Sequence, residues 1–429
     1  MTFMKNGFYI GILAVFFFAM GVGIVSAGAS LEQDPFTEFR LTADDPSGEK
    51  EFGRSVAIDG DLLAVGAGGD GYIGTVYLYK RHGMGYVHEA ELDFPDPIPE
   101  MCPQPGIIGN CSEFGRTVAI QGNTVFVGAR FAPVDTSTGT LNAGAVYVFR
   151  KHGDFWQYED KIVSPVPEEG DNFGRALAVQ GNLLIVTARK TVNEEGAAFV
   201  YLYKGGMWVH MTNLVASDPT KNAYFGQSVD IQGDVIAIGA RNTGPEKEGG
   251  FYIFRKSGDE WMEIAKVTSP DADSDAPDDE GKIVIDNQYG FTIAIEGDMI
   301  AVGARRANPD HLEDAGAVYV YSVKEDSVEL ITKLTASDTS AFDEFGQSVA
   351  FGGDVLAVGA WKDDNKQGSI YLFSRKGDQW VETNKITASD GRKSDEFGYS
   401  LAAFGNRIVT GAHKARSGVG AAYVFPLKQ

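Results

Sequence analysis

Four arginines that recur at one motif position are the first candidates for binding chemistry in this chain. Each directly follows a Gly-Ala or Thr-Ala pair, and the four are Arg130, Arg189, Arg241 and Arg305. Glutamates recur directly before a Phe-Gly pair, at Glu51, Glu113, Glu344 and Glu396. Guanidinium groups bind carboxylates in a two-pronged geometry. Salt bridges between neighbouring repeats are therefore the favoured interpretation, and an arc of arginines that binds an acidic ligand is the alternative.

An acidic segment at residues 271–281 has the spacing of a calcium-binding loop. Its sequence is DADSDAPDDEG, and the carboxylates at loop positions 1, 3, 5 and 9 are Asp271, Asp273, Asp275 and Asp279. Ala276 stands where such a loop needs glycine for its sharp turn, and Pro277 follows. A solvated acidic loop is therefore the favoured interpretation. Calcium is the one cofactor that the sequence leaves open.

Two ring-bearing residues stand where the arginines stand in other repeats. Trp361 and His413 each follow a Gly-Ala pair near the C-terminal end of the chain. Trp361 could stack on a sugar or on a side chain of a partner, although packing against its own loop is favoured. The same two interpretations apply to His413.

Catalytic chemistry has little support in this sequence. The six histidines scatter over predicted turns and loops, and the sequence contains no GxSxG or HExxH motif and no phosphate-binding loop. Carboxylates are too abundant to select the pair that a glycosidase needs. We therefore predict no catalytic residue and expect that the protein is not an enzyme.

A repeated pattern shows which elements must position these residues. An aromatic-Gly pair occurs seven times, at Phe52, Phe114, Phe173, Phe225, Tyr289, Phe345 and Phe397. Fourteen residues after each aromatic comes the small pair, whose second member is Ala67, Ala129, Ala188, Ala240, Ala304, Ala360 or Ala412. The spacing inside a copy never varies, whereas the distance between copies ranges from 52 to 64 residues. Rigid units joined by variable loops give this signature.

Each copy reads as four β-strands. Apolar residues alternate on both sides of a Gly-Asp or Gly-Asn pair, which is typical of a two-residue hairpin turn. These two strands, A and B, are followed by a third of the type GAVYVF and by a fourth that usually opens with an aromatic residue. Seven such units predict an all-β fold, a seven-bladed β-propeller of four-stranded antiparallel blades. Strand A begins where strand B ends, so the arginines and glutamates should meet on one rim.

The chain ends predict how the ring closes. The segment 36–45, FTEFRLTADD, matches 381–390, VETNKITASD, position by position. The N-terminal segment should therefore supply the fourth strand of the last blade, and closure removes open sheet edges. The longer, variable connections are the D–A and B–C loops, which lie on one face of a propeller. That face is the expected binding surface.

The aromatic-Gly and Gly-Ala spacing, together with strands such as GAVYVF, resembles the FG-GAP repeat family, whose best-known members are the N-terminal propellers of integrin α subunits. The resemblance covers about residues 36–429. It implies extracellular recognition of a partner. Family members often carry a DxDxDG calcium loop between the two motif segments, but here all seven A–B connections are tight turns. Integrin-type calcium sites are therefore not expected.

The N-terminus predicts export. Lys5 precedes an apolar run over residues 8–25, and small residues follow up to Ala27. This pattern indicates a secretory signal over residues 1–27, before a propeller over residues 31–429. The run is also just long enough to span a bilayer, so an uncleaved anchor is the alternative. Either outcome places the propeller outside the cytoplasm, as a secreted or cell-surface protein.

The two cysteines fit an exported chain. Cys102 and Cys111 lie close together in CPQPGIIGNC, which favours one disulfide that closes a local loop. Two free thiols are the alternative. Asn110 begins a glycosylation sequon, but a bridged neighbour would hinder its modification.

The charge balance narrows the class of partner. The chain of 429 residues carries 37 basic and 59 acidic residues, a net charge of −22. Such a surface disfavours nucleic acid and anionic lipid, so membrane association is expected only if the N-terminal apolar segment is retained. The predicted function is an extracellular ligand-binding or adhesion module that recognises a protein or glycan through its D–A and B–C loops. A structural protein of a cell wall or matrix is the first alternative, and a propeller hydrolase is the second.

Overall fold

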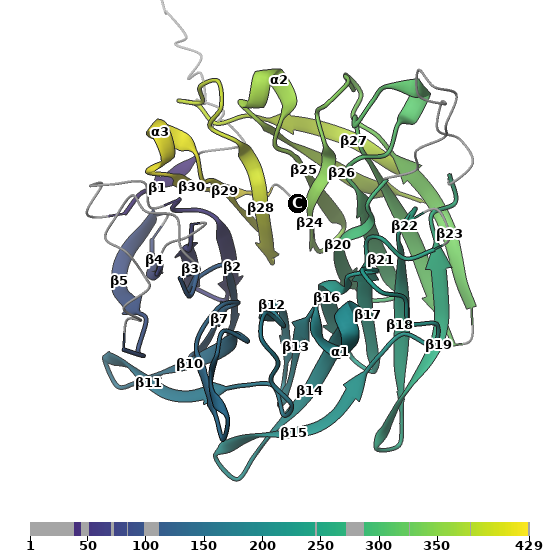
Figure 1. Cartoon of the computed structure of the whole chain (residues 1–429). Helices are drawn as coiled ribbons and strands as arrows, with labels where there is room; N and C mark the ends of the chain where they lie inside the picture. Colours follow the sequence, from purple (N-terminus) through teal and green to yellow (C-terminus); the bar gives the residue numbers. More distant parts are fainter. Residues whose placement is uncertain are drawn as a thin grey trace, which may run out of the picture. The chain divides into compact units, whose positions relative to one another are not determined.

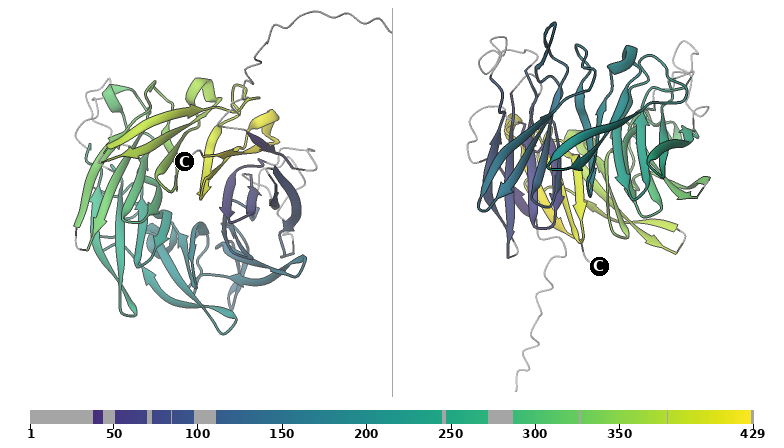
Figure 2. Two further views of the ribbon diagram at one scale, coloured as in Figure 1. Left: turned by 180° about the vertical axis from the view of Figure 1, so that it is seen from behind. Right: turned by 90° about the horizontal axis from the view of Figure 1, so that it is seen from below.

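Seven four-stranded antiparallel sheets are arranged as blades of a ring (Figure 1). The computed structural model describes residues 38–43, 51–69, 73–83, 85–97, 111–244, 247–271, 287–325, 327–377 and 379–427. The predicted signal or anchor segment, residues 1–27, lies outside these ranges. The strands run along the axis of the ring, as the side view in Figure 2 shows.

Six blades are continuous in sequence, and in each of them strands A, B, C and D follow one another. Blade 1 contains β2 (Ser55–Asp59), β3 (Leu62–Ala67), β4 (Thr75–His82) and β5 (Gly85–Asp93). Blade 2 contains β6 (Thr117–Gln121), β7 (Thr124–Ala129), β10 (Ala145–His152) and β11 (Phe155–Ile162). Blade 3 contains β12 (Phe173–Gln180), β13 (Leu183–Ala188), β14 (Ala197–Lys204) and β15 (Met207–Leu214). Blade 4 contains β16 (Phe225–Gln232), β17 (Val235–Ala240), β18 (Gly250–Ser257) and β19 (Glu260–Thr268). Blade 5 contains β20 (Tyr289–Glu296), β21 (Met299–Ala304), β22 (Ala317–Lys324) and β23 (Ser327–Leu334). Blade 6 contains β24 (Phe345–Gly352), β25 (Val355–Ala360), β26 (Ser369–Lys376) and β27 (Gln379–Ile386).

The seventh blade joins the two ends of the chain and confirms the predicted closure. It contains β28 (Phe397–Phe404), β29 (Arg407–Ala412) and β30 (Ala421–Pro426), with β1 (Phe39–Leu41) as its outer strand. In the register of β1 against β30, Arg40 lies opposite Tyr423. The ring is therefore closed by main-chain hydrogen bonds between segments that are almost the whole chain apart.

Strands A surround the axis and strands D form the outer edge (Figure 1). The B–C loops carry the remaining elements: the hairpin of β8 (Val134–Thr136) and β9 (Gly139–Leu141), the 3₁₀ turn η1 (Pro309–His311), and the one-turn helices α1 (Thr191–Glu194), α2 (Asp363–Lys366) and α3 (Ala415–Gly418). The predicted all-β fold contains no helix, and these single turns are too short to show a periodic pattern in the sequence. Within the described ranges, no helix is long and apolar enough to cross a membrane.

The hydrophobic core lies between blades. Each cluster of buried residues combines the facing sides of two neighbouring sheets, as where Val318 and Val320 of blade 5 pack with Leu356 and Val358 of blade 6. The motif aromatic anchors each interface, because it is almost completely buried and meets a strand-C tyrosine or phenylalanine edge-on or tilted. Neighbouring sheets thus stabilise one another, and no single blade has a complete core.

Adjacent blades touch at both motif positions, and glycine stands at each of them in every copy except at Thr187 of blade 3. The second motif residue has a positive φ in all seven copies, between 83° and 92°, a region that favours glycine. A Cβ added to Gly359, the glycine of a Gly-Ala pair, would lie 2.1 Å from the carbonyl oxygen of Gly398 in the next blade. This contact recurs around the ring, and a serine such as Ser348 donates its hydroxyl to the same carbonyl over 2.7 Å.

We predict that Gly359→Ala lowers the free energy of unfolding by about 1–3 kcal/mol, because the new methyl group has no space between two blades. The control is Gly85→Ala, where an added Cβ would meet only ring atoms of Phe39, at 3.8 Å or more. Thermal or urea unfolding of the two variants measures the difference. Equal stability of both would contradict the proposed blade contact.

Candidate ligand-binding site

A cavity on the axis of the ring is the candidate site. It has a volume of about 300 Å³, and each of the seven strands A or its leading residues contributes three consecutive positions. The first of the three is polar or aromatic: Arg54, Arg116, Arg175, Gln227, Phe291, Gln347 or Tyr399. The third is aliphatic: Val56, Val118, Leu177, Val229, Ile293, Val349 or Leu401. A polar ring therefore lies beside an apolar ring in this cavity.

Three motif positions contact one another at the same end of the blades, and we call them the channel rim. They are the residue before the motif aromatic, the second residue after it, and the residue after the small pair. Over seven blades, the channel rim holds seven arginines against four glutamates. This excess of three positive charges lies in a chain whose net charge is −22.

Two of the predicted arginines are paired with carboxylates. Arg130 binds Glu113 through two nitrogens, with Nε 2.6 Å from Oε2 and Nη2 2.9 Å from Oε1. Arg305 Nη1 lies 3.2 Å from Oε2 of Glu344 in the next blade and also donates to Gln347. The prediction of salt bridges between repeats is therefore correct for Arg305. It is wrong for the pair of Arg130 with Glu113, because both residues belong to blade 2, where strand A begins beside the end of strand B.

The other two predicted arginines contact amides and an aromatic ring. Arg189 donates to the side-chain oxygens of Asn172 and Gln227, and Arg241 donates to Gln288. Both guanidiniums lie over the ring of Tyr224, 5.3 Å and 4.8 Å from its centroid. Burial, together with the charges of neighbouring arginines, lowers the pKa of Arg189 to about 10. These contacts leave Arg189 without a carboxylate partner among the described residues.

Trp361 lies in the channel rim and packs within it. Its indole N–H donates to Glu344 Oε2 over 2.9 Å, and its ring meets Tyr399 edge-on at 5.7 Å between centroids. The ammonium group of Lys362 lies 4.9 Å from the ring centroid. These contacts agree with packing in the loop region, and stacking on a ligand stays a prediction.

His413 is buried below the surface of the rim. Its ring lies 4.0 Å from that of Tyr399, and its Nε2 is 3.2 Å from Oε2 of Glu396. Burial, with the charges of Arg54 and Lys414, holds the pKa of His413 well below its ordinary value. Burial raises the pKa of Glu396 to about 7 despite the nearby lysines. We therefore expect His413 to position its neighbours and not to contact a ligand directly.

The first aspartate of the candidate calcium loop has a structural role. Asp271 accepts a hydrogen bond from the hydroxyl of Tyr319 over 2.6 Å and forms an ion pair with Lys333. Asp273, Asp275 and Asp279 lie outside the described residues, so the calcium prediction is not tested. Among the residues that the structure does describe, no group of three or more metal-ligating side chains is found.

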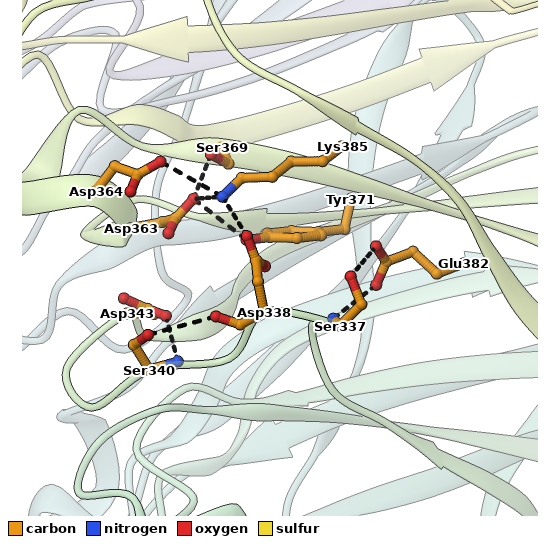
Figure 3. Close-up of polar contacts among 10 residues, drawn as sticks. All are labelled: Ser337, Asp338, Ser340, Asp343, Asp363, Asp364, Ser369, Tyr371, Glu382 and Lys385. Atoms are coloured by element: carbon orange, nitrogen blue, oxygen red, sulfur yellow. Dashed lines mark hydrogen bonds and ion pairs between the residues drawn. The ribbon is translucent and has the colours of Figure 1, made fainter.

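The contacts of Asp271 recur in other blades as an Asp-Tyr-Lys clamp. Figure 3 shows the best-connected copy, in which Asp338 accepts from Tyr371 over 2.8 Å and from Lys385 over 2.7 Å. Lys385 also contacts Asp363 and Asp364 of the B–C loop. Burial opposes ionisation of Asp338, but the hydrogen bonds from Lys385 and Tyr371 outweigh it and lower its pKa. The clamp ties a D–A loop to the next blade.

Blade 3 lacks all three members of the clamp at once. Val166, Phe199 and Asn213 stand where blades 2 and 4 to 7 have aspartate, tyrosine and a basic residue. Blade 1 keeps the tyrosine, Tyr77, but has Glu91 at the basic position. Replacement of the whole set avoids a buried carboxylate or hydroxyl without a partner. In blade 3 the clamp is therefore replaced as one unit.

The predicted disulfide is not tested. Cys111 is buried, and Cys102 lies outside the described residues, as does Asn110 of the sequon.

Comparison with protein families places the chain among known repeats. A family model described as FG-GAP repeat matches residues 36–79, 111–149, 156–201, 208–254, 283–321, 329–373 and 380–425, more than half of the chain. The chain belongs to the FG-GAP repeat family. The first matched segment joins β1 to β2, β3 and β4, so the FG-GAP sequence repeat is offset from the blade by one strand.

Solved structures share the FG-GAP propeller's fold. One of them, a Bacteroides uniformis protein proposed to be a 6-phosphogluconolactonase, is 10% identical, with a TM-score of 0.51. The match covers 78% of this chain and 85% of that one. At this identity, the likeness shows the fold alone. No curated protein matches the sequence.

The sequence analysis did not identify one of the three motif positions that form the channel rim. Arg54, Arg116 and Arg175 stand two residues after the motif aromatic and line the cavity. The signal was present, because basic residues recur at this position in the first three copies. The position lies at the start of predicted strand A, where the alternating pattern alone does not distinguish a binding residue from a packing residue.

We predict that Tyr371→Phe lowers the free energy of unfolding by about 1–2 kcal/mol, since Asp338 loses the hydroxyl donor that lies 2.8 Å from it. The control is Tyr158→Phe, at an exposed tyrosine on strand D. Urea unfolding measures both. A triple variant copies blade 3 at these positions: Asp338→Val, Tyr371→Phe and Lys385→Asn. It should lower the free energy of unfolding by less than the sum of the three single changes. Strict additivity would contradict the view that the clamp acts as a unit.

We predict that Glu396 makes the protein less stable as the pH rises. Its pKa in the folded state is about 7 and its ordinary value is 4.5, so its contribution is fully present below pH 4.5 and is lost as the pH passes 7. The loss is up to about 3 kcal/mol. Glu396→Gln, which copies Gln288 at the same position of blade 5, should remove this part of the pH dependence. Unfolding measured from pH 4 to 8 tests the prediction, with the exposed Glu329→Gln as control. A profile unchanged by Glu396→Gln would refute it.

Proposed function

We propose that this FG-GAP propeller is an extracellular binding module that recognises an acidic region of a protein or glycan through the face formed by its D–A and B–C loops. The observation that carries the proposal is the excess of positive charge at the channel rim of an otherwise acidic chain. The family and the closed ring are compatible with a ligand-binding or adhesion role. Secretion or display at the cell surface is part of the proposal.

The electrostatics of the rim favour an anionic partner. Cations gathered in a concave site focus the field, which raises the local concentration of an opposite charge. The acidic remainder of the surface repels the same partner, so binding elsewhere is suppressed and the partner is guided to the rim. Arginine suits this role because its planar guanidinium pairs with carboxylates through two hydrogen bonds.

A structural role in a cell wall or matrix is the alternative function. Such a role depends on many weak contacts and insolubility, whereas a recognition module binds a discrete soluble partner at one face. Solubility of the exported protein, and the number of rim substitutions needed to abolish binding, distinguish the two.

We predict that the full-length protein binds immobilised poly-L-glutamate or polygalacturonate, and that sodium chloride weakens the binding. The double variant Arg189→Glu and Arg241→Glu should bind at least about tenfold more weakly, because two attractive charges become repulsive. Biolayer interferometry with each acidic polymer provides the measurement.

The matched control reverses two charges in the same blades at the opposite face. Lys204 and Lys256 are exposed near the C–D turns of blades 3 and 4. Lys204→Glu with Lys256→Glu gives the same change in net charge as the rim variant. Equal weakening by both double variants would show a general charge effect and contradict the proposed site.

A further inference from the structure

Arg175 is the one arginine of the cavity lining whose charge is left uncompensated by the described residues. It contributes to the wall of the axial cavity and is partly buried. Among the described residues it forms no hydrogen bond or ion pair, and its Nε is buried without an acceptor. A buried cationic donor without a partner is costly, so it normally has one.

The missing partner is explained by one residue of blade 3. In blades 1 and 2, the arginine at this position pairs with the glutamate three residues before it: Arg54 Nη1 lies 3.3 Å from Glu51, and Arg116 Nη1 lies 3.7 Å from Glu113. In blade 3, that position is Asn172, whose side-chain oxygen accepts instead from Arg189. Blade 3 therefore keeps the cation and lacks the anion.

The surroundings of Arg175 are positive as well. Burial and the charges of Arg189, Arg116 and Arg130 hold the pKa of Arg175 well below its ordinary value. A guanidinium nevertheless stays protonated in proteins. The lowered pKa therefore indicates that several cations crowd one place, an arrangement that a bound anion would stabilise.

Two hydroxyl groups of the lining are occupied by main-chain carbonyls of the next blade, whereas the guanidinium of Arg175 has no such acceptor among the described residues. The hydroxyl of Thr117, beside Arg116, donates to the carbonyl of Gly174, and Ser228 donates to Gly290. The aliphatic ring that includes Val118 and Leu177 forms another part of the same wall. Apolar surroundings of this kind weaken solvent screening and strengthen a charge pair.

We propose that the axial cavity is a binding site for a polyvalent carboxylate. The guanidinium of Arg175 makes the central contact with this anion, and Arg116 and Arg189 lie at its sides. The inference deepens the proposed function, since it rests on the same basic rim, but it names a subsite and a ligand class. A volume of about 300 Å³ fits a small di- or tricarboxylate or the acidic side chains of a partner. More than one negative charge matches the excess of positive charge at the rim.

The test is isothermal titration calorimetry of full-length protein with citrate and with tri-glutamate, at constant ionic strength. Arg175→Gln should weaken binding of the preferred probe at least about tenfold, because the loss of one hydrogen bond to a charged group changes the dissociation constant by about this factor. Glutamine is natural at the same position of blades 4 and 6, as Gln227 and Gln347, so the fold should tolerate the change. Tighter binding of citrate would indicate a free small molecule, and tighter binding of tri-glutamate an acidic segment of a partner.

A second readout separates a binding role from a structural one. Without added anion and at low salt, Arg175→Gln should raise the melting temperature, because it removes a cation from a repulsive cluster. Arg81→Gln, an exposed arginine on the outer turn of blade 1, is the control for the loss of one charge. A lowered melting temperature with unchanged citrate and tri-glutamate affinity would overturn the proposal, as would no binding of either probe at millimolar concentration.

The outcomes also separate this proposal from the proposed function. If citrate and tri-glutamate bind only when Arg175 is present but neither acidic polymer binds, the anion subsite stands and macromolecular recognition fails. If the polymers bind through Arg189 and Arg241 and neither small probe binds, recognition stands and the subsite fails.

Discussion

The contact between two glycines in adjacent blades is the constraint on which the rest of this structure depends. The glycine of each Gly-Ala pair faces the carbonyl oxygen of the next blade's motif glycine, at a distance that a Cβ would not permit. This contact sets the spacing of strands A around the axis. Because it sits at one end of strands A and B, it also fixes which residues form the channel rim. Loops between copies vary in length, yet the rim positions converge in every blade.

Blade 3 is where the repeats depart most from their common pattern, and it is also where the rim is least neutralised. Thr187 replaces the usual glycine, and Ala176 replaces the serine or threonine beside it, so the threonine hydroxyl lies near the main chain of Ala176. Asn172 replaces the glutamate that would neutralise Arg175. The scaffold tolerates these changes because each is compensated locally. The charge on Arg175 is the exception, and this is why we assign it to binding and not to folding.

Much of the fold could be predicted from the sequence because it follows from local rules repeated seven times. The Gly-Asp and Gly-Asn hairpins, the constant motif spacing and the match of segment 36–45 to segment 381–390 gave the blade, the blade count and the closure by β1. The one-turn helices α1, α2 and α3 were missed because four residues are too few for a helical period. The rim arginines were placed at the correct end of the blade, but their partners were not predictable. Whether Arg130 pairs within its own blade and Arg305 across a boundary depends on side-chain reach at a particular junction. The uncompensated charge of Arg175 is visible in the sequence only when the seven repeats are aligned and Asn172 is seen to replace the glutamate of blades 1 and 2.

The central claim is that the channel rim attracts and holds an anion. The most direct measurement is an anomalous difference map from a crystal of the full-length protein soaked in selenate, whose selenium scatters strongly. The account predicts a peak on the axis of the ring, within hydrogen-bonding distance of the Arg175 guanidinium. Peaks confined to lysines of the outer surface, with only water beside Arg175, would contradict it.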